Sequence, residues 1–190
     1  MSTVQVQRPR NKRLTVHDEL AVLIRARYPI IYVITWEEIR VERQLREIAA
    51  RRGKELFCWS VTSGLHKSGS ANKIQRTKGL ADPVEALDAV IEHKEPAIYL
   101  FKDFHPFMRA RDANVAVVRK LREVAAALSD SYKTLVVTSP LLEIAPELEK
   151  DVSVLDYPLP DAPDFESLLD RICADVADHA KVTIELDAAA

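Results

Sequence analysis

Short apolar runs alternate with amphipathic stretches along this chain, and this alternation restricts the fold more than any other feature of the sequence. Five runs consist almost entirely of apolar side chains, as in strands that are buried on both faces. These runs cover residues 30–34, 56–61, 97–101, 134–138 and 152–157. Apolar side chains at helical spacing mark residues 16–27, 36–52, 84–91, 113–129 and 165–176. The alternation predicts an α/β fold with a five-stranded, mainly parallel sheet flanked by helices.

The composition fits a globular chain with one sizeable core, because 47% of its 190 residues are hydrophobic. No run approaches the ~20 apolar residues that span a bilayer, and the start of the chain has no apolar signal core. We therefore expect a cytoplasmic protein without membrane contact. Cys58 and Cys173 match no metal or redox spacing, so we expect buried thiols and no metal site.

The chain is basic in front and acidic behind, although its net charge is only -2. Residues 1–13 hold four Arg and Lys, one Pro and no acid, which predicts a disordered basic tail. We expect a single α/β domain over residues 14–182. Residues 183–190 are expected to be a C-terminal tail or a truncation point. The charge asymmetry is compatible with an acidic partner or nucleic acid, and also with solvated faces alone.

The residues after the first predicted strand conflict with phosphate binding. In parallel sheets, ligands bind at the carboxyl ends of the strands, where a glycine-rich turn brings backbone N–H groups close to phosphate. Here the junction reads Thr35-Trp36-Glu37-Glu38, which has no glycine and carries two carboxylates. We interpret both acids as partners of the helix dipole. Thr35 is predicted to cap the helix, with Glu38 at the capping-box position and Gly53 at the other end.

The loop after the second predicted strand nearly spells the phosphate-loop pattern, but no lysine follows Gly69. The region is nevertheless basic, since residues 56–81 contain no acid. Its basic residues are predicted partner-binding positions for phosphates or an acidic neighbour, and a solvated loop remains the alternative. They are Lys67, Lys73, Arg76 and Lys78. Trp59 is expected in the core.

Polar side chains also follow the third and fourth predicted strands. Asp103 comes shortly after an apolar run, the layout that places a carboxylate beside a nucleotide-bound Mg²⁺. Phe104 stands where a catalytic acid would adjoin it, and His105 is a candidate acid or base. Thr138 and Ser139 place hydroxyls where a γ-phosphate sensor would sit, or where they would cap the next turn.

These segments together resemble a known family. The strand ends at Asp103 and at Thr138-Ser139, followed by residues 144–161, look like the second half of an AAA-type ATPase core. Residues 23–38, LIRARYPIIYVITWEE, and residues 59–65, WSVTSGL, resemble the opening of a bacterial and plastid family of AAA-domain proteins. That family was first described as a hypothetical chloroplast open reading frame. The likeness covers roughly residues 16–182.

The resemblance implies a P-loop-NTPase/AAA-like layout without a phosphate-binding loop, placed ahead of an intact AAA module that binds ATP and Mg²⁺. An arginine finger expected after residues 146–148 is replaced by Glu149-Lys150-Asp151. Where it is used, such a finger raises the rate of hydrolysis by about 10³- to 10⁵-fold. Because the phosphate-binding loop and the finger are both missing, we expect no catalytic residue and no cofactor in this chain. Asp103, Thr138 and Ser139 are then degenerate Mg- and sensor-like positions.

Three functions follow as hypotheses. The first is a non-catalytic N-terminal domain for assembly, regulation or substrate engagement, packed against its own or a neighbouring AAA module in a homo-oligomer. The second is a stand-alone binder of nucleic acid or an acidic protein, using residues 1–13 and 64–79. The third is an active nucleotide-binding enzyme that uses Asp103 with the loop at 64–70, which would require Lys67 to act from the wrong position.

Overall fold

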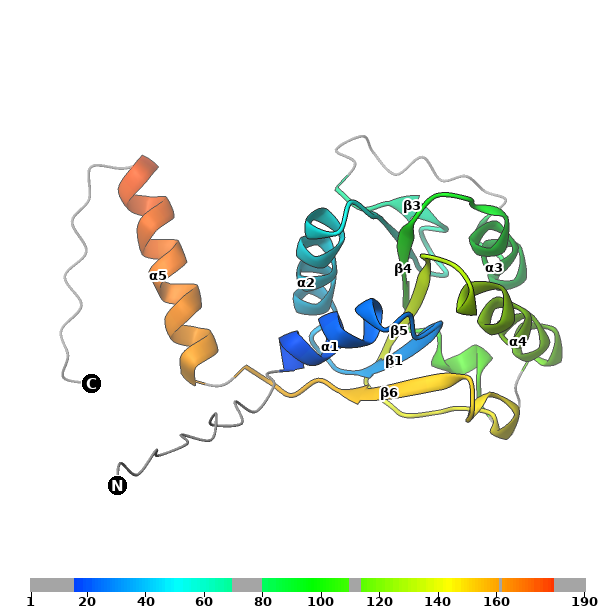
Figure 1. The fold of residues 1–190 in the computed structure, drawn as a ribbon. Coiled ribbons are helices and arrows are strands. Elements are labelled where there is room, and N and C mark those ends of the chain that lie inside the picture. Colours follow the sequence, from blue (N-terminus) through cyan, green and yellow to red (C-terminus); the bar gives the residue numbers. More distant parts are fainter. Residues whose placement is uncertain (1–15, 70–79, 110–113, 161, 180–190) are drawn as a thin grey trace, which may run out of the picture. The chain divides into compact units, whose positions relative to one another are not determined.

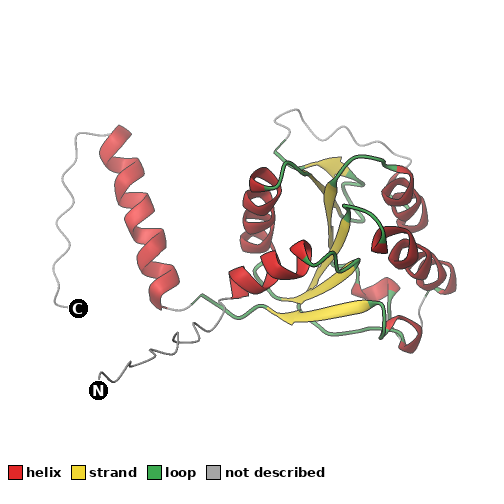
Figure 2. Ribbon diagram, viewed as in Figure 1, coloured by secondary structure: helices red, strands yellow, loops and turns green. Residues whose placement is uncertain are grey.

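The computed structural model describes residues 16–69, 80–109, 114–160 and 162–179. Strands and helices alternate along it, as the apolar pattern predicts (Figures 1 and 2). The elements are α1 (Val16–Arg25), β1 (Ile30–Ile34), α2 (Glu38–Arg51), β2 (Glu55–Trp59), β3 (His66–Lys67), α3 (Pro83–Glu92), β4 (Ala97–Lys102), α4 (Val115–Ser129), β5 (Thr134–Ser139), β6 (Val152–Asp156) and α5 (Ala162–His179). Short 3₁₀ turns follow at η2 (His105–Phe107) and η3 (Pro146–Leu148).

The strands form one sheet in the order β3-β2-β4-β5-β1-β6. Its five long strands run parallel, which confirms the predicted fold class. The sixth strand, β3, was not predicted and pairs antiparallel with β2, with Phe57 opposite Lys67. A strand of two residues is too short to show a period of two, so the sequence carries no signal for it.

The register brings the carboxyl ends of the central strands to one edge of the sheet. Ile34, the last residue of β1, lies opposite Ser139 of β5 and Asp156 of β6. Lys102, the last residue of β4, lies opposite Thr138. The residues that follow β1, β4 and β5 are therefore neighbours in space although they are distant in sequence.

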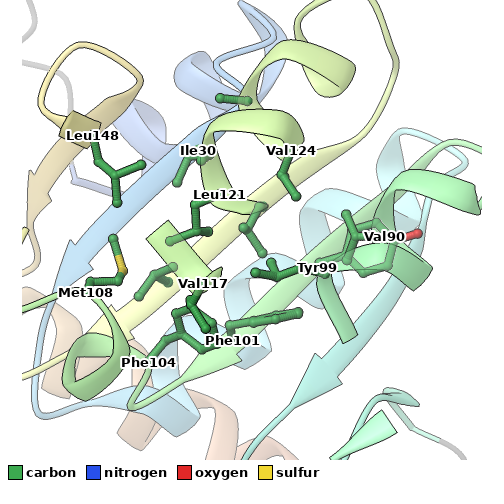
Figure 3. Packing of buried hydrophobic residues seen from close by; sticks show 14 of the residues in the cluster. Ile30, Val90, Tyr99, Phe101, Phe104, Met108, Val117, Leu121, Val124 and Leu148 are labelled. Carbon is green, nitrogen blue, oxygen red and sulfur yellow. The ribbon is translucent and has the colours of Figure 1, made fainter. Parts of the chain in front are cut away.

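Helices α1 to α4 cover both faces of the sheet and bury two apolar layers (Figure 1). On one face, α1 and α2 pack through Leu20, Val41 and Leu45. On the other face, α3 and α4 pack over β4 and β5, and Figure 3 shows Val117 and Leu121 of α4 beside the aromatic side chains of β4. Side chains of each strand alternate between the two layers, which is why the strands are apolar throughout.

Helix ends follow local capping chemistry. The side chain of Asp82 accepts hydrogen bonds from the first turn of α3, and Asn114 does the same for α4. Helix α4 therefore begins at Val115 rather than at the predicted residue 113. Gly53, at φ +61°, ends α2 as predicted, because its left-handed conformation turns the chain so that the N–H of Lys54 reaches the carbonyl of Ala49 at 2.9 Å.

The predicted capping box at the start of α2 is wrong. The helix begins at Glu38, after Glu37, and no side chain caps its first turn. Instead, the Thr35 hydroxyl oxygen accepts a hydrogen bond from the backbone N–H of Glu37 at 2.9 Å. Only Trp36 lies between Thr35 and Glu37, so the hydroxyl closes a tight local turn before the helix starts.

The chain divides into two compact units, Met1–Tyr157 and Pro158–Ala190. The first contains the sheet, and the second contains α5. The predicted domain covers residues 14–182. Both of its ends lie outside the described residues, as do the two predicted tails. Cys58 is buried as expected, whereas Cys173 is half-buried rather than buried. Three apolar side chains of its helix are exposed, namely Phe165, Leu169 and Ile172.

Candidate functional site

The carboxyl edge of the sheet carries a cavity of about 220 Å³. It brings together Asp103, Thr138 and Ser139, the three positions that the sequence predicted as degenerate Mg- and sensor-like residues. The β1–α2 junction and the turn after β5 complete the lining with Thr35, Trp36, Glu38 and Pro140. Residues from three separate strand ends thus meet in one place, as the parallel topology predicts.

Asp103 lies directly after β4 in a left-handed backbone conformation, at φ +50°. Its backbone N–H donates to the carbonyl of Thr138 at 2.9 Å, which ties the end of β4 to β5. Asp is one of the few residue types that adopt this conformation readily. The side chain is exposed, and no described residue forms an ion pair with its carboxylate.

The two hydroxyls after β5 have different environments. Ser139 is committed to its own turn, since its hydroxyl donates to the carbonyl of Leu141 at 2.9 Å and accepts from the N–H of Leu141 at 3.1 Å. Thr138 is 2% exposed, and its hydroxyl oxygen has no hydrogen-bond partner among the described residues. Burying a hydroxyl without a partner costs about 1–3 kcal/mol in proteins, so this residue requires an explanation.

Three acids and two bases set the charge beside the cavity. Lys102 lies 2.8 Å from a carboxylate oxygen of Glu42 and 3.6 Å from one of Glu38. Burial is the largest single influence and opposes both charges, but the hydrogen bonds and opposite charges around each group together outweigh it, so the pKa of Glu42 is lowered and that of Lys102 is raised. Glu42 is also paired with Arg46, whose guanidinium lies 2.8 Å from its other carboxylate oxygen. Glu38 and Asp103 leave the cavity net negative.

Glu42 and Lys102 were missed by the sequence reasoning. Lys102 precedes Asp103 directly, and Glu38 and Glu42 are four residues apart on one face of α2. Both spacings were visible. The pairing across α2 and β4 was not, because it depends on how that helix packs against the sheet.

The basic loop after β2 lies mostly outside the described residues, which leave out Lys73, Arg76 and Lys78. Lys67 is described, and its ammonium lies 2.5 Å from the carboxylate of Glu55. Glu55 is the first residue of β2, so this pair lies toward the amino end of that strand, away from the edge that holds Asp103. The structure does not bring Lys67 and Asp103 together.

A larger hollow of about 340 Å³ lies along α4 and is lined on one side by Asp151. Its Arg119 is already paired with Glu123 at 3.1 Å, and its walls come from the solvent side of one helix. Within the described ranges, no three His, Cys, Asp or Glu residues group as a metal site would require. No described helix is long and apolar enough to cross a membrane.

The two thiols should differ sharply in reactivity. Burial raises the pKa of Cys58 to about 12, and the Glu42 carboxylate adds to the rise. Since the thiolate is the nucleophile, we expect iodoacetamide at pH 8 to modify half-buried Cys173 at least about tenfold faster than Cys58. Peptide mass spectrometry over time measures both rates, and unfolding in guanidinium serves as the control that equalises them. Equal rates in the folded protein would contradict the buried position of Cys58.

The fold and the cavity define a class of protein: an α/β domain with the sheet of a P-loop NTPase and an acidic junction in place of the phosphate loop. The family model described as SpoVK-like AAA ATPase, N-terminal domain, matches residues 16–157, and the chain belongs to this family. This confirms the resemblance carried by residues 23–38 and 59–65.

Relatives and solved structures agree with this assignment. The AAA domain-containing protein ycf46 of Trieres chinensis is 31% identical over 147 residues, covering 76% of this chain and 28% of the relative. Its counterpart in Guillardia theta is 31% identical over 157 residues, covering 81% and 29%. The chain thus spans less than a third of these relatives. A chain in the E. coli MS115-1 HORMA:CdnC:Trip13 complex superimposes with TM-score 0.50 at 12% identity, covering 86% of this chain and 57% of that one, which shows a shared fold alone.

Proposed function

We propose that this chain is a non-catalytic N-terminal domain of an AAA-type ATPase, which serves assembly, regulation or substrate engagement. In this proposal a separate AAA module binds ATP and Mg²⁺, and the domain packs against that module in its own or a neighbouring subunit of a homo-oligomer. The observation that carries the proposal is the acidic cavity at the strand ends. A phosphate group placed there would meet the carboxylates of Glu38 and Asp103, which repel it.

Family membership and length support the same proposal. The matching family describes the N-terminal domain of AAA ATPases, and the relatives are more than three times as long as the matched segment. The alternative of a stand-alone binder of nucleic acid or an acidic protein gains no support from Lys67, which is paired with Glu55. Its remaining basic residues lie outside the described part of the chain.

The test uses the isolated chain with ATP and Mg²⁺. A ligand present at 100 times its Kd stabilises a protein by about 2.7 kcal/mol, which raises Tm by about 5–10 °C for a domain of this size. We expect 5 mM MgATP to shift Tm by less than about 1 °C and to be hydrolysed no faster than in buffer. Robust hydrolysis that requires Mg²⁺ would contradict the proposal.

A docking measurement complements this test. We expect the remaining part of the parent protein, expressed separately, to hydrolyse ATP and to form a complex with this chain in analytical ultracentrifugation. If the separate part hydrolyses ATP but never binds the chain, the packing role is wrong while the non-catalytic role stands.

A further inference from the structure

The cavity at the carboxyl edge has the charge of a cation site. Asp103 presents an exposed carboxylate with no ion-pair partner among the described residues, and Glu38 keeps only a 3.6 Å contact with Lys102. Glu42 takes the shorter contact with that lysine, at 2.8 Å. Negative charge therefore remains at the cavity after the internal pairing is counted, and it attracts a positive group from outside.

A second observation at the same cavity is independent of charge. Thr138 lines it, is 98% buried, and has a hydroxyl oxygen without a hydrogen-bond partner in the described structure. Ser139, its neighbour in sequence, is fully engaged with Leu141. A hydroxyl can accept a hydrogen bond from a bound donor, so an incoming N–H group would relieve the cost of burying Thr138 unpaired.

An exposed aromatic side chain lines the cavity, and exposed apolar side chains lie next in sequence to other lining residues. Trp36, one of only two tryptophans in the chain, lines the cavity and is 77% exposed. Ile39, three residues further on α2, is equally exposed, and Leu141 lies exposed after β5. A tryptophan face stabilises a cation above it by about 0.5–2 kcal/mol, and guanidinium groups stack there especially well.

The size of the cavity and the chemistry of its lining restrict which class of ligand can bind. Pockets for small molecules and cofactors usually measure about 300–1,000 Å³, so about 220 Å³ is small for a nucleotide and sufficient for the end of one side chain. A divalent metal prefers several carboxylate ligands, and the described residues offer no group of three metal-binding side chains. A planar guanidinium with five N–H donors fits two carboxylates, one hydroxyl and an aromatic face.

We propose that the cavity lined by Trp36, Glu38, Asp103 and Thr138 binds an arginine side chain presented by another polypeptide. The guanidinium donates to the carboxylates of Asp103 and Glu38 and to the Thr138 hydroxyl, and it stacks on Trp36. This site goes beyond the proposed function, because it takes an arginine whether the partner is an AAA module or a different protein. The exposed side chains of Ile39 and Leu141, each next in sequence to a lining residue, would contact the partner around that arginine.

The test follows the two indole N–H signals of the ¹⁵N-labelled chain by NMR, assigned with Trp36→Phe. The probe is the peptide acetyl-Gly-Arg-Gly-amide, and the matched control is the same peptide with citrulline, which keeps the shape and removes the charge. We expect the Trp36 signal to shift saturably with the arginine peptide, with a Kd on the order of 1 mM. The Trp59 signal should stay fixed, and the citrulline peptide at equal ionic strength should shift neither.

Substitutions test which residues bind the arginine peptide. Asp103→Asn should weaken binding of the arginine peptide at least about tenfold. It removes a charge-assisted hydrogen bond, while asparagine keeps the left-handed backbone conformation. Thr138→Val should weaken binding of the same peptide about fivefold. Asp130→Asn removes the same charge from the C-terminal cap of α4 and should leave Kd unchanged. Spectra of each variant without peptide show whether it is folded.

Three results would overturn the proposal. One is the absence of any Trp36 shift with the arginine peptide up to 20 mM, against a Kd on the order of 1 mM. Another is equal binding of the citrulline peptide, which would remove the role of charge. The third is displacement of the arginine peptide by millimolar MgCl₂ at constant ionic strength, which would make this a metal site. None of these readouts depends on ATP hydrolysis, so they fail or succeed separately from the proposed function.

Discussion

Replacing Trp59 by alanine is expected to lower the free energy of unfolding by about 3–5 kcal/mol, the usual cost of deleting a large buried aromatic side chain. Trp59 is fully buried, stacks on Phe101 with ring centroids 5.1 Å apart, and meets the ring of Phe104 edge-on at 5.2 Å. Its indole N–H also donates to the carbonyl of Leu80 at 3.0 Å. Deleting the side chain removes the packing and one of the two hydrogen bonds that the carbonyl accepts, the other coming from the N–H of Leu65.

Trp36→Ala is the matched control, because it deletes the same side chain at a position that is 77% exposed. Surface substitutions usually change stability by no more than about 0.5 kcal/mol. Urea denaturation followed by circular dichroism measures both variants without relying on tryptophan fluorescence. At about 2–4 °C per kcal/mol, the Tm of Trp59→Ala should fall by about 6–20 °C. Similar losses for the two variants would contradict the assignment of Trp59 to the core.

Lys133→Met should destabilise the protein by about 2–4 kcal/mol, although methionine is the more apolar residue. Lys133 is 7% exposed, and its ammonium donates to the carbonyls of Val90, Ile91 and His93 at 2.8, 2.9 and 2.6 Å. These carbonyls lie at the end of α3, where no further helical N–H reaches them. Methionine fills the space but satisfies none of them, and unsatisfied buried carbonyls cost about 1–3 kcal/mol each when water cannot enter.

Lys94→Met provides the comparison for this prediction, since Lys94 is exposed and close in sequence to the same helix end. We expect its effect to stay within about 0.5 kcal/mol. Thermal and urea unfolding of the two variants separate the loss of one positive charge, which both share, from the loss of the helix cap. A small effect of Lys133→Met would mean that water replaces the ammonium at the three carbonyls.

Much of the fold could be read from the sequence because its elements depend on local patterns. Each of the five predicted strands is present and parallel. The start of α3 at Asp82-Pro83 and the end of α2 at Gly53 follow sequence signals that are a few residues long. The failures also have local causes. Thr35 made a turn with Glu37 in place of a cap, and β3 was too short to show a period.

The candidate site was only partly predictable. Parallel strands end at one edge, so Asp103, Thr138 and Ser139 were expected near one another, and they line one cavity. Their hydrogen bonds were not predictable, because each depends on a neighbour from a distant segment or on the path of a turn. Ser139 bonds within its own turn, while Thr138 is left without a partner among the described residues.

The sequence by itself determined the α/β class, the parallel sheet and the absence of a phosphate loop, because these depend on apolar period and on the residues of one short junction. Only the tertiary structure decided that Lys102 is held by Glu42 and Glu38, that Lys133, just before β5, caps the end of α3, and that exposed Trp36 lines an acidic cavity. Those facts depend on contacts between residues more than thirty positions apart or on the packing of a helix against the sheet. Long-range contacts of this kind leave no periodic trace in a single sequence.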